Sequence, residues 1–162
     1  MVLSAQTIEK LCKQKEEPLL DPFCLRDTYE GVSFGLSAAG YDVRVEFDQY
    51  GLIPAVWLEP GEFLLASTIE KFHMPRDIVG IVHDKSTWAR HGIAVQNTVI
   101  EPGWSGWLTL EITNHGSRTV KLMRGMGIAQ VVFHLLDQPT EFPYEGKYQA
   151  QRRGPVGAKN DE

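Results

Sequence analysis

Apolar residues recur along the chain with two different periods, which divide it into a short helical start and a long strand-rich remainder. The segment LSAQTIEKLCKQ (3–14) places Ile8 and Leu11 on one helical face, with Ser4 as the expected cap accepting a hydrogen bond from a free backbone N–H. After Pro18, brief or alternating apolar runs are separated by glycine and proline, as is typical of strands and turns. The runs are YDVRVEF (41–47), GEFLLASTIEKF (61–72), DIVGIVHD (77–84), GIAVQNTVI (92–100), GWLTLEITN (106–114) and TVKLMRGMGIAQVVFHLL (119–136). The pattern predicts an all-β (mainly β) sandwich, jelly roll or barrel.

The length favours a single domain. A chain of 162 residues has the usual size of one domain, so we expect one unit over 1–162. Its N-terminal helical segment lies within 1–20, and the final segment, 141–162, is polar and lacks an apolar period. Such a tail is disordered by itself, unless it closes over a site as a lid.

Charge and cysteine content exclude some classes of function. The net charge of −5 argues against a general affinity for nucleic acid, so an anionic ligand must meet a local cluster of cations. Two cysteines without a charged and then apolar leader are typical of reduced thiols in a cytoplasmic protein. The apolar runs are too short to span a bilayer, so no membrane partner is expected.

Motifs for metal and phosphate binding are missing. Zinc-dependent nucleoside deaminases need H-x-E and P-C-x-x-C, and neither occurs here. No P-loop motif is present, and the five histidines show no ligand spacing. We therefore expect no zinc and no metal ligands from the protein.

Two carboxylates near glycine-rich turns are candidates for acid/base chemistry. Glu101 lies in VIEPGWSG, which is suited to a tight turn. Glu111 lies in an apolar strand, on the same face as Thr109 and Thr113. The opposite face carries Leu108, Leu110 and Ile112. Glu111 belongs either to a solvated outer face or to a cavity wall, where desolvation would raise its pKa and make it a proton donor and acceptor.

A third candidate site is the segment HDKSTWARHGIAV (83–95), which combines two cations with two neighbouring hydroxyls. Lys85, Ser86, Thr87 and Arg90 suit the oxygens of a bound triphosphate. The alternative is structural: the hydroxyls cap a short helix and Arg90 pairs with a surface carboxylate.

Five segments, in order, resemble the dCTP deaminase family of the deaminase/dUTPase superfamily: SAAGYDVRV, DKSTWAR, IEPGWSGWLTLEITNHG, RGMGIAQ and KYQAQRRGP. The opening MVLSAQTIEKL is also similar to the start of those chains. The resemblance implies a compact, jelly-roll-like or distorted β-barrel fold of the dUTPase type. It further implies a homotrimer with active sites between subunits. In YDVRV it leaves Asp42 and Arg44 as scaffold residues that are expected to form a buried or intersubunit ion pair.

The same resemblance implies roles for the candidate residues. Glu111 matches the catalytic glutamate, and Ser86 and Arg90 match residues near the base and the catalytic water. Glu101 stands where the family usually has aspartate, in contact with the sugar. The residues implied to bind the remaining parts of the nucleotide are Lys85 and Thr87 on phosphates, Gln96 and Asn97 at the base, and Tyr144, Lys147 and Gln151 in a C-terminal lid.

The implied activity is hydrolytic deamination of dCTP to dUTP and ammonia, with Mg²⁺ bound through the triphosphate. The loop 92–101 is about two residues shorter than its family counterpart, so base identity stays open, including a modified pyrimidine. Glu101 and the shortened loop keep one alternative open, a dUTPase or a bifunctional enzyme that releases dUMP and pyrophosphate. A non-catalytic nucleotide-binding trimer is a further alternative, because a fold alone does not determine function. Feedback by dTTP also stays open.

Overall fold

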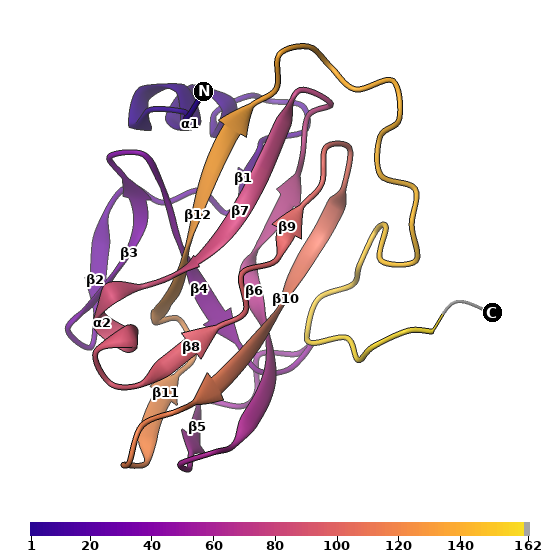
Figure 1. Ribbon diagram of the computed structural model, residues 1–162. Coiled ribbons are helices and arrows are strands. Elements are labelled where there is room, and N and C mark those ends of the chain that lie inside the picture. Colours follow the sequence, from indigo (N-terminus) through magenta and orange to yellow (C-terminus); the bar gives the residue numbers. More distant parts are fainter. Residues whose placement is uncertain (161–162) are drawn as a thin grey trace.

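The computed structural model describes residues 1–160 and is built mainly from β-strands (Figure 1). Two helices are present in this range, α1 (Ala5–Cys12) and α2 (Ser86–Ala89). The strands are β1 (Leu20–Asp21), β2 (Asp27–Tyr29), β3 (Val32–Ser37), β4 (Gly40–Glu46), β5 (Ala55–Leu58), β6 (Phe63–His73), β7 (Ile78–Asp84), β8 (Ile93–Val95), β9 (Val99–Ile100), β10 (Ser105–Asn114), β11 (Val120–Met123) and β12 (Gly127–Leu135). The mainly β class predicted from the sequence is confirmed.

Most strands join one large antiparallel sheet that curls into a half-barrel. Its order is β8-β10-β6-β4-β12-β7-β9, with β1 on β6 and the β2-β3 pair on β4. The hairpin β5-β11 forms a separate small sheet. In Figure 1, α1 lies at one end of the curled sheet, β5 and β11 lie at the other, and the tail after β12 descends along one side. The fold therefore brings the tail alongside β10, far from it in sequence.

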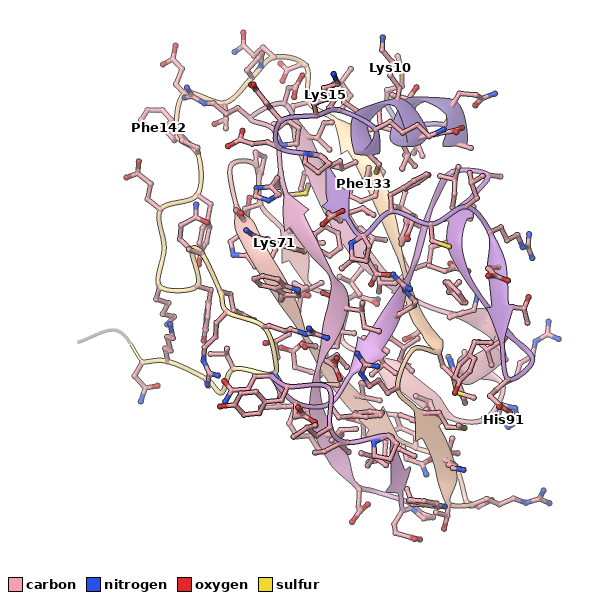
Figure 2. The ribbon with its side chains drawn as sticks, turned by 180° about the vertical axis from the view of Figure 1, so that it is seen from behind. Lys10, Lys15, Lys71, His91, Phe133 and Phe142 are labelled. Carbon is pink, nitrogen blue, oxygen red and sulfur yellow. The ribbon has the colours of Figure 1, made fainter. Side chains whose placement is uncertain are left out.

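The core fills the inside of this curled sheet. Strand β4 contributes Tyr41, Val43 and Val45, all without solvent exposure, and Phe133 of β12 is equally buried (Figure 2). By contrast, Phe142 in the tail is 87 % exposed and points away from the body. Alternation along the strands thus places apolar side chains inside, as the period-2 pattern predicts.

The polar face of β4 is also buried, and each of its charged residues has its own partner. Asp42 binds Lys85, and Arg44 Nε donates to Glu70 Oε1 at 2.7 Å. Within one chain, the expected ion pair of Asp42 with Arg44 is therefore wrong, while an intersubunit pair stays a prediction. Residues two apart on one strand face lie side by side, and each instead meets an opposite charge from another segment.

Helix α1 covers one end of the core. Ile8 is buried and Leu11 packs against the core, as predicted, and Cys12 is also buried. Ser4 stands at the N-cap position, but its side chain makes no capping bond and instead lies 3.3 Å from the Thr7 hydroxyl. Cys12 and Cys24 are free thiols. Within residues 1–160 no helix is long and apolar enough to cross a membrane.

A register irregularity interrupts β10 where the site begins. The pairing of β10 with β6 shifts between Trp107 and Thr109, and Leu108 N donates to the Thr68 hydroxyl at 3.1 Å. Two steps along β10 oppose four along β6 here, and Leu108 borders the cavity that Thr109 and Glu111 line. Leu108 is nevertheless buried in the core with Leu110 and Ile112, as the period-2 pattern predicts.

Candidate active site

A cavity of about 520 Å³ lies between the outer side of β6 and β10 and the C-terminal tail. Its walls come from four segments: the start of β6, the 98–104 turn, β10 and the tail. The lining residues are Phe63, Leu65, Thr98, Val99, Ile100, Glu101, Trp104, Leu108, Thr109, Glu111, Tyr144, Tyr148, Gln151, Val156 and Ala158. The size is that of a small-molecule site with mostly apolar and aromatic walls and a few polar groups.

Glu111 is the most unusual polar group in this cavity. Its position on β10 is fixed by pairing with Leu65 of β6 and by the Gln96 N–H, which donates to the Glu111 carbonyl at 3.0 Å. The side-chain atom Oε2 is buried and has no hydrogen-bond partner within the described residues. Desolvation by burial raises the pKa of the Glu111 carboxyl above its ordinary value. The cavity interpretation of Glu111 therefore fits the structure better than a solvated face.

The second predicted carboxylate lies in the same cavity. Glu101 is exposed and begins the turn in which its carbonyl accepts from the Trp104 N–H at 3.1 Å. The sequence pattern thus identified two acidic residues that the fold brings to one cavity. Their surroundings differ, because Glu111 lies within a strand while Glu101 is at the solvent-facing rim.

The tail forms one complete wall of the cavity. Gln151 is buried, and its Nε2 donates to the Thr109 hydroxyl at 2.5 Å and to the Trp107 carbonyl at 2.8 Å. The Tyr144 N–H donates to the Pro102 carbonyl at 2.9 Å. Of the three predicted lid residues, Tyr144 and Gln151 line the cavity. The third, Lys147, is exposed, with its Nζ 5.7 Å from the centre of the Tyr148 ring.

The close contact of tail and strand depends on Gly106. Its φ is +147°, and a Cβ built there would lie 2.7 Å from the Gln151 nitrogen and 2.8 Å from the Gln151 oxygen. Backbone pairing continues at the next residue, where the Trp107 N–H donates to the Gln151 carbonyl at 3.1 Å. The absence of a side chain at position 106 thus allows the tail to lie directly on β10.

The predicted phosphate loop lies elsewhere in the chain. Ser86, Thr87 and Arg90 are exposed on or beside α2, and none of them lines the cavity. Figure 1 shows α2 and the tail on opposite sides of the sheet. The Trp88 Nε1–H donates to the Gly127 carbonyl at 2.6 Å and holds this helix in place. Within one chain, the loop is separate from the Glu111 cavity.

Lys85 points inward rather than to solvent. Its side chain is 10 % exposed, and its Nζ donates to Asp42 and, at 3.0 Å, to the Ser33 hydroxyl. Gln130 Nε2 donates to the other Asp42 oxygen at 3.1 Å. In this arrangement the Lys85 charge is used to neutralise a buried carboxylate.

The base-recognition residues expected from the 92–101 loop do not line the cavity either. Gln96 and Asn97 are exposed, and the next two residues, Thr98 and Val99, form the wall instead. Sequence reasoning did not single out Thr109, Tyr148 or Thr98 as site residues. Thr109 could have been identified from the sequence pattern, because it lies on the same strand face as Glu111.

Within residues 1–160 there is no cluster of three or more histidine, cysteine or acidic side chains placed to hold a metal ion. Binding of Mg²⁺ through the phosphate oxygens of a nucleotide stays a prediction, and an ion bound in this way needs few protein ligands.

Comparison with known proteins agrees with this architecture. Residues 44–136 match the family model described as dCTP deaminase-like. The chain is 38 % identical to a dCTP deaminase of Campylobacter fetus subsp. fetus over 162 residues, covering 84 % of this chain and 87 % of that protein. It is 36 % identical to a dCTP deaminase of Acidobacterium capsulatum over 166 residues, covering 86 % and 91 %.

Solved structures share the fold at low sequence identity. The 2'-deoxycytidine 5'-triphosphate deaminase of Agrobacterium tumefaciens matches with a TM-score of 0.66 and 19 % identity, over 83 % of this chain and 47 % of that one. The EIAV dUTPase matches with a TM-score of 0.52 and 22 % identity, over 67 % and 84 %. These likenesses confirm the dUTPase-like fold expected from the sequence.

Proposed function

Because the chain belongs to the dCTP deaminase-like family, we propose that it is a hydrolase that converts dCTP and water to dUTP and ammonia. The observation that carries this proposal is the Glu111 carboxyl, which faces a cavity with one oxygen unpaired and its pKa raised by desolvation. A carboxyl whose pKa is raised by desolvation can accept a proton from water and return it during the reaction.

The proposed chemistry uses Glu111 for each proton transfer. Glu111 takes a proton from water as the oxygen attacks C4 of the cytosine ring. It returns this proton to N3, which gives a tetrahedral C4 that carries a hydroxyl and the amino group. Glu111 then takes the hydroxyl proton and passes it to the amino group, so that the C4–N bond breaks, ammonia leaves and the C4 carbonyl forms. No step in this scheme requires zinc. Trp104, Tyr144 and Tyr148 line the same cavity and offer aromatic surface for a base.

The triphosphate is proposed to bind Ser86, Thr87 and Arg90, with Ser86 and Arg90 also reaching the reacting end. Their loop does not line the Glu111 cavity of its own chain, which supports a site completed by a second copy. We therefore propose a homotrimer with sites between subunits. Lys147 and Gln151 would contact phosphates when the tail closes, and Mg²⁺ would travel with the nucleotide. Lys85 would bind the triphosphate only if its ion pair with Asp42 were broken.

A second candidate function has one observation in its favour. Glu101 lies at the rim of the same cavity, where a carboxylate can orient water toward a phosphate. This favours a bifunctional enzyme that also releases dUMP and pyrophosphate. A dUTPase alone, or a nucleotide-binding trimer without catalysis, would instead leave the Glu111 arrangement without a role.

Incubation of the protein with dCTP and Mg²⁺, with ammonia and pyrophosphate measured separately, tests both candidates. Ammonia alone supports deamination, and both products support the bifunctional enzyme. Glu111→Gln should reduce ammonia release by at least about 10²–10⁴-fold while nucleotide binding by calorimetry persists. The exposed Glu141 provides a matched control, since Glu141→Gln makes the same change outside the cavity. Deamination by Glu111→Gln above about a tenth of the original rate would exclude the proposed proton shuttle.

A further inference from the structure

A turn in the tail, Gln151 to Val156, is tied at both ends to the strand that carries Glu111. Gln151 Nε2 donates to the Thr109 hydroxyl at 2.5 Å, and the Val156 N–H donates to the same oxygen at 3.1 Å. Thr109 and Glu111 both line the cavity, as do Gln151 and Val156. The position of this turn therefore decides the shape of the wall beside Glu111.

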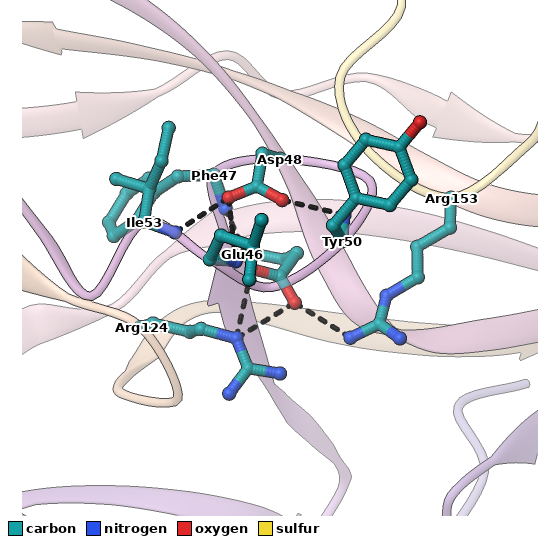
Figure 3. A network of polar contacts seen from close by, with 8 residues as sticks. Glu46, Phe47, Asp48, Tyr50, Ile53, Arg124 and Arg153 are labelled. Atoms are coloured by element: carbon teal, nitrogen blue, oxygen red, sulfur yellow. Dashed lines mark hydrogen bonds and ion pairs between the residues drawn. The ribbon is translucent and has the colours of Figure 1, made fainter.

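The middle of the turn is held by a buried carboxylate from another strand. Glu46, the last residue of β4, has no solvent exposure, and its Oε2 accepts from Arg153 Nη2 at 2.8 Å. Arg124 Nε lies 3.0 and 2.9 Å from the two Glu46 oxygens, and the Phe47 N–H donates to Oε1 at 3.1 Å. Figure 3 shows the two arginines converging on Glu46. A buried carboxylate is stable only when it is paired and hydrogen-bonded in this way.

The two arginines belong to different parts of the fold. Arg124 directly follows β11, and its backbone N–H donates to the Pro54 carbonyl at 2.9 Å, so it is part of the body of the domain. Arg153 comes from the tail. Without the Arg153 contact, the buried Glu46 carboxylate keeps two partners from the body, the Arg124 guanidinium and the Phe47 N–H. The contact of Arg153 with Glu46 is therefore suited to holding the tail rather than to building the core.

We propose that Arg153 is a positioning residue, which by binding Glu46 holds the 151–156 turn against β10 and so keeps Gln151 and Val156 in the wall of the Glu111 cavity. Its effect on catalysis rests on the proposed deaminase function. When the tail leaves β10 part of the time, fewer molecules have a complete cavity wall. The apparent affinity for substrate then falls in proportion to the fraction of molecules that keep the complete wall. Saturating substrate restores the closed tail, so KM rises while kcat changes little.

The test compares Arg153→Gln with Arg152→Gln. Both remove one positive charge from the tail, but the Arg152 guanidinium donates to the neutral side chain of Gln49, which is exposed. Amide hydrogen exchange reports the tail directly, because the Trp107 and Val156 N–H groups bond across the tail contact. In the Arg153→Gln variant, both amides should exchange about tenfold faster than in the wild type, as expected for loss of a charge-assisted bond. The exchange rates of the Leu110 and Ile112 amides should not change.

In kinetic assays with dCTP, Arg153→Gln should raise KM about tenfold with kcat within about threefold, and Arg153→Lys should restore part of the loss. Unchanged exchange in Arg153→Gln, or equal acceleration in Arg152→Gln, would overturn the proposal. If the wild-type protein does not deaminate dCTP, the exchange result still decides the role of Arg153, and only the proposed function fails.

Discussion

Replacement of Lys85 by methionine tests whether this residue is a buried ion partner, as the structure places it. The Lys85 and Asp42 side chains are each 10 % exposed, so the change leaves Asp42 inside the protein with Gln130 as a neutral donor. Breaking a buried pair costs about 3–5 kcal/mol, and the remaining Gln130 bond favours the lower end, about 3 kcal/mol. At about 2–4 °C per kcal/mol for a domain of this size, Tm should fall by about 6–12 °C.

Thermal unfolding followed by circular dichroism at fixed protein concentration measures this effect. Lys10→Met is the matched control, because Lys10 is exposed on α1 (Figure 2) and its loss should shift Tm by less than about 2 °C. Adding Asp42→Asn to Lys85→Met removes the unpaired charge and should recover part of the loss. A Lys85→Met protein with unchanged Tm but weakened nucleotide binding would refute the buried-pair reasoning and return Lys85 to the phosphate site.

Three further predictions address the cavity and the assembly. Gly106→Ala should release the tail and weaken dCTP turnover, because the new Cβ would lie 2.7–2.8 Å from the Gln151 backbone. Proteolysis that cuts the tail of this variant no faster than that of the wild type would contradict the prediction. Folding raises the pKa of Glu111 above 4.5, so the folded state binds the carboxyl proton more tightly than the unfolded state. The stability of the wild type should therefore fall relative to that of Glu111→Gln as pH rises from 4.5 through the folded pKa. Urea unfolding at several pH values measures this difference. Light scattering should give the mass of a trimer, whereas a monomer across the micromolar range would remove the intersubunit site.

The sequence identified the strands well because their signals are local. Alternating apolar residues in YDVRVEF and GWLTLEITN, with glycine and proline between runs, indicate β4 and β10 without knowledge of their neighbours. The helical start followed from the spacing of Ile8 and Leu11. The capping bond expected of Ser4 was wrong because the hydroxyl faces Thr7. The preference of serine for the N-cap position indicates where the helix begins, whereas the capping hydrogen bond depends on the local geometry of the side chain.

The candidate site divides in the same way. Glu111 and Glu101 could be selected from the sequence, because a carboxylate within an apolar strand and another beside a Pro-Gly turn stand out by pattern. Local pattern could not show that the register of β10 shifts between Trp107 and Thr109, since the irregularity arises from pairing with β6. Nor could it show that the hydroxyls beside Lys85 lie away from the Glu111 cavity in the same chain.

By itself, then, the sequence determined the mainly β class, the order of the strands along the chain and the acidic residues worth testing, because periodicity and turn chemistry act over a few neighbouring residues. Only the tertiary structure decided which charges meet. Glu46 pairs with Arg153, which is 107 positions away, and Gln151 reaches Thr109 across 42 positions. Such contacts form when the curled sheet brings the tail beside β10, and no short-range pattern encodes a partner that the folding of the whole chain selects.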